Sequence, residues 1–234
     1  MVCLGDSNVR GQVSVSFVDI LRQRLSDERF HFINAGVNGD LAYNVLKRLD
    51  AVVTQRPDIV VILVGTNDVN ATLTPRMSQG YRLWKRLPEE PRPEWYRANM
   101  LNIIRTLKEN TSARIAVTSQ PVLGEDLASV ANDRIRNYNS LLFQLAVQEG
   151  ITYLPLHEQQ EESLRRIGHD SGRPHDADSM LMWTSIFRHY VLRRDFESTA
   201  RENGFALTTE GLHLNEAGAV IMADLLEAFL RESA

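Results

Sequence analysis

The sequence has little cysteine and no long apolar run. Cys3 is its single cysteine, which excludes a disulfide within the chain and fits a reducing compartment. Cys3 lies inside an apolar stretch, so we expect a buried small side chain rather than a reactive thiol. No stretch is long enough to cross a bilayer, and no secretory signal is recognisable. We therefore expect a cytoplasmic protein, or a secreted one if a leader has been removed.

An excess of positive charge is also missing. The 26 Lys and Arg residues are outnumbered by 30 Asp and Glu residues, which gives a net charge of −4, and the two signs are interleaved along the chain. This balance gives no reason to expect nucleic acid or an anionic membrane as a partner. The apolar share of 43% and the charged share of 24% are ordinary for a globular protein. The 234 residues are enough for one large α/β domain or two small ones, and for a sizeable core.

Several motifs that would indicate other chemistries are absent. There is no Gly-x-Ser-x-Gly nucleophile elbow, no Gly-x-x-x-x-Gly-Lys-Ser/Thr and no Gly-x-Gly-x-x-Gly. His169-Asp170 and His175-Asp176-x-Asp178 group possible metal ligands, but their spacing matches no HExxH or CxxC type of site. A glycine and a proline lie between the two groups, so we interpret this segment as a solvated loop.

Apolar β-type runs alternate with helical patterns along the chain. The runs cover residues 2–4, 30–33, 59–64, 114–118 and 151–154. The run 59–64 is apolar throughout, as in a strand covered on both faces. Amphipathic stripes predict helices near 41–53, 95–107 and 141–146, and Asn215 is placed to cap a final helix. This alternation predicts right-handed βαβ units and hence an α/β fold with a parallel sheet.

Two long segments interrupt the alternation. Residues 70–94 end in a proline-rich stretch, and residues 157–209 contain one expected helix, around 180–194. The side chains of that helix available for burial are Leu181, Ile186, Tyr190 and Val191. Connections of this size are usually functional or mobile. We interpret both as insertions into a single domain spanning 1–234, with an independent helical subdomain at 157–209 as the alternative.

The stretch 180–187 is unusually apolar for an insertion. It could form a lid or an acyl-chain wall beside a cleft, with Tyr81 and Trp84 of the other insertion as the opposite wall. Ordinary packing of an extra helix is the other interpretation. We favour packing slightly, because a helix must bury one stripe in either case.

Small and polar residues follow the first three predicted strands. The three turns are Gly5-Asp6-Ser7-Asn8, residues 34–40 with Gly39 among them, and Gly65-Thr66-Asn67-Asp68. In a parallel sheet these turns meet at one edge, where open α/β sheets bind their ligands. We expect Asp6 and Asp68 to tie the turns together, and Asn8 is a candidate for the pocket lining. Much later, Glu210 and His213 lie just before the capped final helix.

These residue types suit acyl transfer. A serine hydroxyl is a weak nucleophile until a base takes its proton, and His213 is the candidate base for Ser7. A carboxylate beside the imidazole would set its tautomer and stabilise the imidazolium, and Glu210 is close enough in sequence to do so. An oxyanion needs preorganised donors. The backbone N–H groups of Ser7 and Gly39 and the side-chain amide of Asn67 are the candidates.

Together, these blocks resemble the SGNH hydrolases, also called the GDSL family of esterases and lipases. The resemblance rests on Gly5-Asp6-Ser7, Gly39, Gly65-Thr66-Asn67-Asp68 and Glu210-x-x-His213. It implies a flavodoxin-like, three-layer α/β/α fold with a five-stranded parallel sheet. It also implies Ser7 as nucleophile, His213 as base, and Ser7, Gly39 and Asn67 as oxyanion-hole donors. Neither a metal nor an organic cofactor is implied.

One position departs from the family pattern, which usually has Asp three residues before the histidine. Glu210 adds one methylene, about 1.5 Å of reach. Glutamate fills this role in other hydrolases, so a Ser-His-Glu triad is consistent with the chemistry. The alternative is that Glu210 points away and a backbone carbonyl orients His213.

The sequence therefore predicts a serine-dependent acyl-ester hydrolase of the esterase or lipase type, acting on a small-molecule ester. An acyltransferase or a carbohydrate deacetylase using the same site is the first alternative. A flavodoxin-like binding module that has lost turnover is the second. Nothing in the sequence indicates an oligomeric state.

Overall fold

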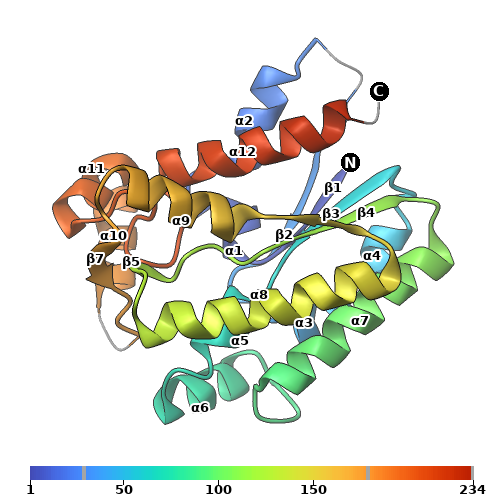
Figure 1. Ribbon diagram of the computed structural model, residues 1–234, viewed down its shortest axis with the longest axis horizontal. Coiled ribbons are helices and arrows are strands. Elements are labelled where there is room, and N and C mark those ends of the chain that lie inside the picture. Colours follow the sequence, from blue (N-terminus) through green and yellow to red (C-terminus); the bar gives the residue numbers. More distant parts are fainter. Residues whose placement is uncertain (28–29, 178–179, 233–234) are drawn as a thin grey trace.

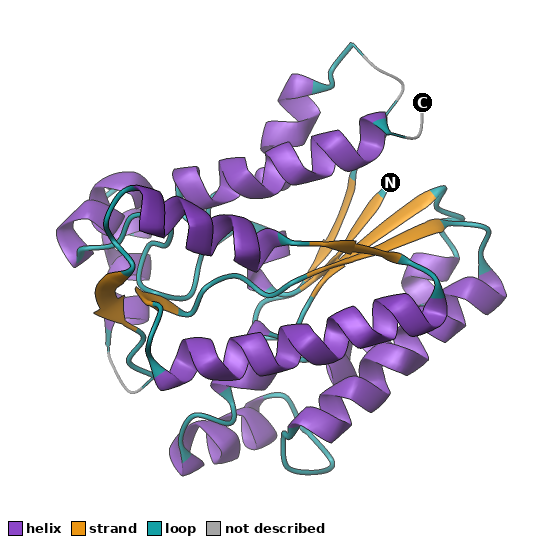
Figure 2. Ribbon diagram, in the orientation of Figure 1, coloured by secondary structure: helices purple, strands orange, loops and turns teal. Residues whose placement is uncertain are grey.

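The structure is a computed structural model that describes residues 1–27, 30–177 and 180–232. Its centre is a five-stranded sheet in the order β2-β1-β3-β4-β6, with every neighbouring pair parallel (Figure 2). The strands are β1 (Val2–Gly5), β2 (Ile33–Gly36), β3 (Ile59–Leu63), β4 (Arg114–Thr118) and β6 (Thr152–Leu154). A short antiparallel pair, β5 (Gly124–Asp126) and β7 (Ser171–Pro174), lies apart from this sheet.

Alternate side chains of each strand point to opposite faces of the sheet and enter two separate cores. On β1, Val2 and Leu4 belong to one core and Cys3 to the other. Cys3 is buried, as predicted, and burial raises the pKa of its thiol to about 12. The thiol therefore stays protonated and unreactive.

Helices cover both faces of the sheet and complete a three-layer α/β/α fold (Figure 1). One face carries α3 (Ala42–Lys47), α7 (Pro93–Asn110) and α8 (Val130–Glu149), and the other carries α2 (Phe17–Arg24), α9 (Leu156–Arg166) and α12 (Glu216–Arg231). The remaining described helices are α1 (Ser7–Arg10), α4 (Asp50–Val53), α5 (Thr66–Asn70), α6 (Pro75–Trp84), α10 (Leu181–Tyr190) and α11 (Phe196–Asn203). The predicted cap of the last helix is confirmed, because the Asn215 side chain accepts a hydrogen bond from the Gly218 N–H at 3.0 Å.

The strand order places a topological switch point beside Ser7. From β1 the chain moves outward to β2, then crosses back to β3 on the other side of β1. The loops after β1 and β3 therefore leave the sheet in different directions, and a crevice opens between them. Ser7 follows β1 at this crevice, and α5 with Asn67 follows β3.

The second strand is displaced from its predicted position. We expected residues 30–33, but pairing with β1 runs from Ile33 to Gly36. Phe30 and Phe32 pack against the α2–α12 side of the core without joining the ladder. The paired stretch includes Asn34 and a glycine, which resemble a turn in sequence; Asn34 in fact donates to the Val9 carbonyl at 2.7 Å.

The long segments contain more regular structure than predicted. The stripe at 41–53 forms two short helices, α3 and α4, and α10 corresponds to the one helix expected in 157–209. We did not predict α9 and α11. The buried face of α9 includes polar Gln160, which accepts a hydrogen bond from the Val122 N–H at 2.9 Å, so apolar periodicity does not reveal it.

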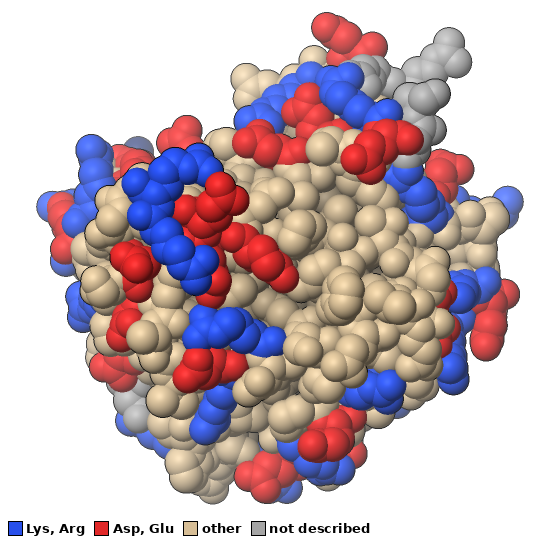
Figure 3. All heavy atoms as spheres, viewed as in Figure 1, with Lys and Arg blue, Asp and Glu red and all other residues tan. Residues whose placement is uncertain are grey.

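Charges of both signs are mixed on the face shown in Figure 3, and an uncharged area spreads over the β6 edge and the C-terminal half of α8. Exposed Phe143 and Val147 belong to this part of α8. Among the residues that the structure describes, no helix combines the length and apolar character needed to span a bilayer.

Candidate active site

Ser7 lies at the beginning of α1, directly after β1. Asp6 is the N-cap of this short helix, and its Oδ1 accepts a hydrogen bond from the Asn8 N–H at 3.0 Å. The cap turns the chain sharply at the carboxyl end of the strand, so the Ser7 side chain faces a cavity while only 5% of the residue is exposed.

The structure brings Ser7, His213 and Glu210 together. His213 Nε2 lies 2.9 Å from Ser7 Oγ, across 206 residues of sequence. On the other side of the ring, Nδ1 makes a hydrogen bond with Glu210 Oε1. The alternative in which Glu210 points away is therefore wrong in this structure. All three residues are buried.

Asn8 holds the loop that carries His213. Its Nδ2 donates to the Leu212 carbonyl at 3.3 Å, and its Oδ1 accepts from the Leu214 N–H at 3.1 Å. These two bonds bracket His213 on both sides in sequence. Asn8 is not among the residues that line the cavity, so our expectation of a pocket-lining role is wrong. The Asn8 amide instead forms hydrogen bonds with the backbone of Leu212 and Leu214.

Glu125 supports the same loop from β5, a role we did not predict. Its buried carboxylate accepts hydrogen bonds from the N–H groups of Ala206, Leu207 and Thr208 at 2.6–3.0 Å. A carboxylate that accepts several backbone bonds fixes a turn without regular secondary structure. A lone glutamate gives no such signal in the sequence.

The pKa of His213 is raised above its ordinary 6.5. Burial lowers it, but the negative charge and hydrogen bond of Glu210 outweigh burial, and the charge of Asp6 acts in the same direction. Burial also raises the pKa of Asp6 to about 7, against the opposing hydrogen bond from the Asn8 N–H. The imidazole is thus placed to accept a proton from Ser7 and to be stabilised once it has done so.

Gly39 and Asn67, the predicted oxyanion donors, line the same cavity as Ser7. Gly39 has φ +73°, and a Cβ there would lie 2.1 Å from Cη2 of Trp84, so no larger residue fits without movement. Asn67 Nδ2 donates to the Asp40 carbonyl at 3.1 Å and to Asp6 Oδ2 at 3.3 Å. Asp68 Oδ2 accepts from the Ala42 N–H at 3.0 Å, so Asp6 and Asp68 both tie neighbouring turns together, as expected.

The cavity has a volume of about 640 Å³ and is walled by two helices from the long segments. Met77, Tyr81 and Trp84 line it from α6, and Met180, Trp183 and Ile186 line it on the α10 side. The structure therefore corrects the packing interpretation of the stretch 180–187, because this helix forms a cavity wall. Of the side chains expected to be buried there, Tyr190 and Val191 are more than half exposed.

The proposed solvated loop is also corrected in part. His175 follows β7 and lines the cavity, with its Nε2 3.0 Å from Asn70 Oδ1. Burial lowers the pKa of His175 to about 4, despite the opposing charge of Asp176 and the Gly211 carbonyl. His169 instead lies 3.1 Å from Glu125, and Asp178 lies outside the described residues. The described part of the chain contains no group of three or more His, Cys, Asp and Glu side chains placed to hold a metal.

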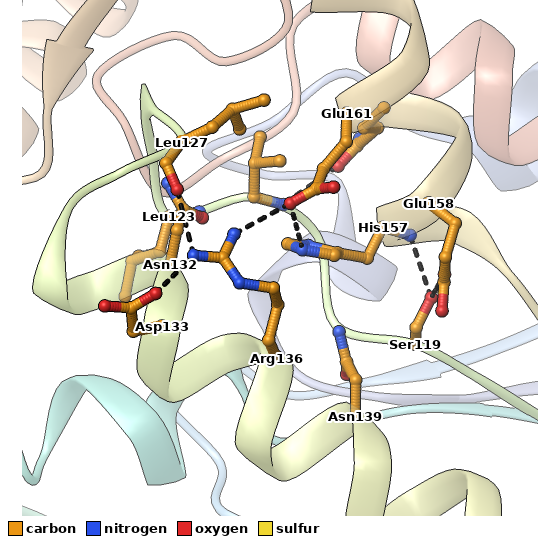
Figure 4. Close-up of polar contacts among 12 residues, drawn as sticks. Ser119, Leu123, Leu127, Asn132, Asp133, Arg136, Asn139, His157, Glu158 and Glu161 are labelled. Carbon is orange, nitrogen blue, oxygen red and sulfur yellow. Dashed lines mark hydrogen bonds and ion pairs between the residues drawn. The ribbon is translucent and has the colours of Figure 1, made fainter. Parts of the chain in front are cut away.

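A second serine, histidine and glutamate cluster lies between β4 and α9 (Figure 4). Ser119 Oγ accepts from the backbone N–H of His157 and donates to Glu158, both at 2.8 Å. The His157 ring contacts Glu161, which also binds Arg136. No hydrogen bond joins the ring to the Ser119 hydroxyl, so this cluster connects α8 and α9 and does not activate a nucleophile.

The sequence profile of the GDSL-like Lipase/Acylhydrolase family matches residues 3–221. No curated protein is significantly similar in sequence. Among solved structures, the chain is similar to the acetyl xylan esterase AlAXEase, with TM-score 0.72, 17% identity and 98% of each chain covered. It is also similar to Axe2, an acetylxylan esterase from Geobacillus stearothermophilus, with TM-score 0.67, 16% identity, and 99% of this chain and 92% of Axe2 covered. A putative acylhydrolase from Bacteroides fragilis NCTC 9343 has TM-score 0.64, 16% identity, and coverage of 99% and 86%.

The matches to solved structures bear out the predicted α/β/α fold, and the family profile extends over nearly the whole sequence, from the strand before Ser7 to the final helix. The predicted resemblance is therefore confirmed: the chain belongs to the GDSL-like Lipase/Acylhydrolase family and is a serine carboxylic ester hydrolase.

Proposed function

We propose that Ser7, His213 and Glu210 form the catalytic triad of this hydrolase. The observation that carries the proposal is the continuous contact from Ser7 Oγ to His213 Nε2, at 2.9 Å, and from His213 Nδ1 to Glu210. A nucleophile, its base and an orienting carboxylate are arranged in the order that acyl transfer requires.

In the first half of the reaction, Ser7 Oγ attacks the ester carbonyl carbon and its proton passes to His213 Nε2. The carbonyl π electrons move to oxygen, which becomes an oxyanion. When the intermediate collapses, the C–O bond to the alcohol breaks and the leaving oxygen takes the proton from Nε2. An acyl-enzyme on Ser7 and a free alcohol result.

In the second half, water attacks the acyl carbon and gives a proton to His213 Nε2. The acid then leaves as the bond to Ser7 Oγ breaks, and Oγ recovers the proton. Glu210 keeps Nδ1 protonated throughout, so Nε2 is the atom that exchanges protons.

The oxyanion is assigned to the N–H groups of Ser7 and Gly39 and to Asn67 Nδ2. Of the two bonds that Asn67 Nδ2 makes here, the one to Asp6 is the longer, at 3.3 Å. We assign the N–H on that side to the oxyanion. Each such donor contributes about 3 kcal/mol of barrier lowering.

The substrate proposed is a small ester whose acyl or alcohol part lies between α6 and α10. Methionine, tryptophan and isoleucine side chains make up much of both walls, which favours an apolar substituent. Acetylated carbohydrate is a second candidate. It is favoured by the similarity to two acetylxylan esterases and by the exposed indoles of Trp84 and Trp183, which offer flat faces for a sugar ring.

Hydrolysis of p-nitrophenyl esters tests the proposal. We expect a burst of p-nitrophenol from wild type, and its loss in Ser7→Ala and His213→Ala variants that keep the wild-type thermal unfolding temperature. Comparing p-nitrophenyl esters of increasing acyl length with acetylated xylo-oligosaccharide separates the two substrate classes. Added sugar acceptor detects acyl transfer. Turnover that survives Ser7→Ala would refute the triad, and ligand binding without turnover in wild type would indicate a binding module.

A further inference from the structure

A chain of hydrogen bonds runs from the segment 157–209, through the segment 70–94, to Asn67. His175 Nε2 lies 3.0 Å from Asn70 Oδ1, and Asn70 Nδ2 lies 3.3 Å from the Tyr81 hydroxyl oxygen. The Tyr81 hydroxyl donates to Asn67 Oδ1 at 2.7 Å, the shortest of the three bonds. The elements that carry these residues gather on the side of the molecule where the strands end (Figure 1).

The direction of the chain is determined by its chemistry. Burial raises the pKa of Tyr81 well above its usual value, so the hydroxyl keeps its proton and can donate it in a hydrogen bond. Asn67 Nδ2 faces two acceptors, a carbonyl and a carboxylate, so its Oδ1 must face Tyr81. Asn70 Nδ2 then donates to the tyrosine oxygen, and Asn70 Oδ1 accepts from His175, whose low pKa keeps the ring neutral near pH 7.

Every donor in this chain therefore points toward Asn67. Hydrogen bonds aligned head to tail polarise one another, by about 10–30% per bond. An amide whose oxygen accepts a strong hydrogen bond is a better donor through its nitrogen. It is also held in one of its two flip orientations, which prevents its oxygen from facing a developing negative charge.

We propose that Tyr81, with Asn70 and His175 behind it, is a positioning residue for oxyanion stabilisation by Asn67. This inference rests on the proposed role of Asn67 in the oxyanion hole. It gives both long segments a role in the rate of the reaction, in addition to their role as walls of the cavity. Tyr81 acts through Asn67 and is not assigned a contact with the reacting atoms.

The test is Tyr81→Phe, which removes one oxygen and keeps the ring against Trp84, whose centroid lies 5.8 Å away. We expect kcat to fall about 10-fold with little change in KM, less than the roughly 10²–10³-fold loss for removing an oxyanion donor itself. Phenylboronic acid, whose tetrahedral adduct with Ser7 carries an oxygen at the oxyanion position, should bind more weakly by a similar factor. A purely structural role would not couple kcat to the affinity for this analogue.

The matched control is Tyr153→Phe. Tyr153 lies on β6 and does not line the cavity, and its hydroxyl donates a hydrogen bond to Glu158 at 2.8 Å. We expect kcat of the Tyr153→Phe variant to equal that of wild type. At the end of the hydrogen-bond chain farthest from Asn67, His175→Gln keeps an N–H donor in the place of Nε2, so this variant should retain more activity than His175→Phe.

The outcomes separate this inference from the proposed function. If wild type is active, Ser7→Ala is inactive and Tyr81→Phe lies within about twofold of wild type in both kcat and boronate affinity, the positioning role is overturned while the triad stands. Equal activity of His175→Gln and His175→Phe would overturn the part assigned to His175. Activity that survives Ser7→Ala would overturn the proposed function itself.

Discussion

Replacing Glu210 by glutamine tests the most unusual member of the proposed triad. Glu210 is buried and forms a hydrogen bond with His213 Nδ1, and its charge is the main reason that the pKa of His213 is raised despite burial. Glu210→Gln removes the charge and keeps the size. With the charge gone, burial dominates and the pKa of His213 should fall.

The magnitude follows from the type of interaction. A hydrogen bond to a charged group contributes about 1.5–3 kcal/mol, and this stabilisation applies to the imidazolium that forms as Ser7 attacks. Its loss corresponds to a decrease in kcat of about 10- to 150-fold, and it lowers the pKa of His213 as well. If the amide also favours the wrong imidazole tautomer, the loss approaches about 10⁴-fold.

The assay is the pH dependence of kcat/KM for p-nitrophenyl acetate, whose acid limb reports the free enzyme. The base must be neutral to act, so activity is lost as the pH falls through the pKa of His213. We expect a midpoint above 6.5 in wild type and a lower midpoint, with a lower plateau, in Glu210→Gln. Asp6, with a pKa of about 7, is present in both proteins, so the difference between them reports His213.

Glu210→Asp is the control for reach. It keeps the charge and restores the usual family residue, but it withdraws the carboxylate by about 1.5 Å. Because the shorter side chain weakens the hydrogen bond to His213 Nδ1 but keeps the negative charge nearby, we expect Glu210→Asp to lose about 10-fold in kcat with little change in the midpoint. An unshifted midpoint and unchanged kcat in Glu210→Gln would refute the reasoning, and would show that another group orients His213.

Three further predictions concern the surroundings of the site. Gly39→Ala places a Cβ against Trp84 on backbone with φ +73°, so kcat should fall about 10- to 100-fold, and Trp84 fluorescence should change with it. Arg48 donates hydrogen bonds to three oxygens where β1 and β2 end, so Arg48→Met should lower the free energy of unfolding by about 2–4 kcal/mol. The control Arg166→Met removes an exposed ion pair and should lower it by almost nothing, and urea denaturation of both variants measures the difference. The pKa of Glu161 is lowered from 4.5 to about 2, chiefly by the His157 hydrogen bond. Its ionised form therefore stabilises the fold above about pH 4.5, and this stabilisation disappears as the pH falls toward 2. The loss of unfolding free energy in Glu161→Gln should shrink over the same pH range, which unfolding measured as a function of pH checks.

Ser7, Asn67 and His213, three of the proposed catalytic residues, were predictable because each lies in a recognisable local pattern. Ser7 and Asn67 come immediately after apolar strands, and the alternation of strands with helices predicts a parallel sheet whose ends meet. His213 lies just before a helix with a clear capping residue. The reach of Glu210 was predictable only as one of two alternatives, since a side chain three residues from a histidine can face either way in an irregular loop.

Other parts of the fold were hidden because polar residues form their buried faces. In α11, for example, Thr199 and Asn203 are buried, and Asn203 donates to the Thr209 carbonyl at 2.9 Å. An apolar stripe is the main sign of a helix in a sequence, so a helix buried through hydrogen bonds is missed. The position of the edge strand β2 was predicted wrongly for a similar reason. The Asn34 side chain forms hydrogen bonds with the backbone of Val9 and Gly36, so a polar residue lies inside the strand.

The walls of the cavity and the hydrogen-bond chain to Asn67 depend entirely on tertiary contacts. Asn70 and His175 are 105 residues apart, and the sequence groups His175 only with possible metal ligands, while Asn70 lies in no pattern that would single it out. In the proposed mechanism, the ends of the strands position Ser7 and Asn67, whereas the two long segments supply the walls of the cavity in which we place the substrate. Substitutions at the strand ends should therefore decide whether any ester is cleaved. Substitutions on α6 and α10 at positions that make no bond to Asn67, such as Trp183, should change which ester is preferred and leave the pH dependence set by His213 intact.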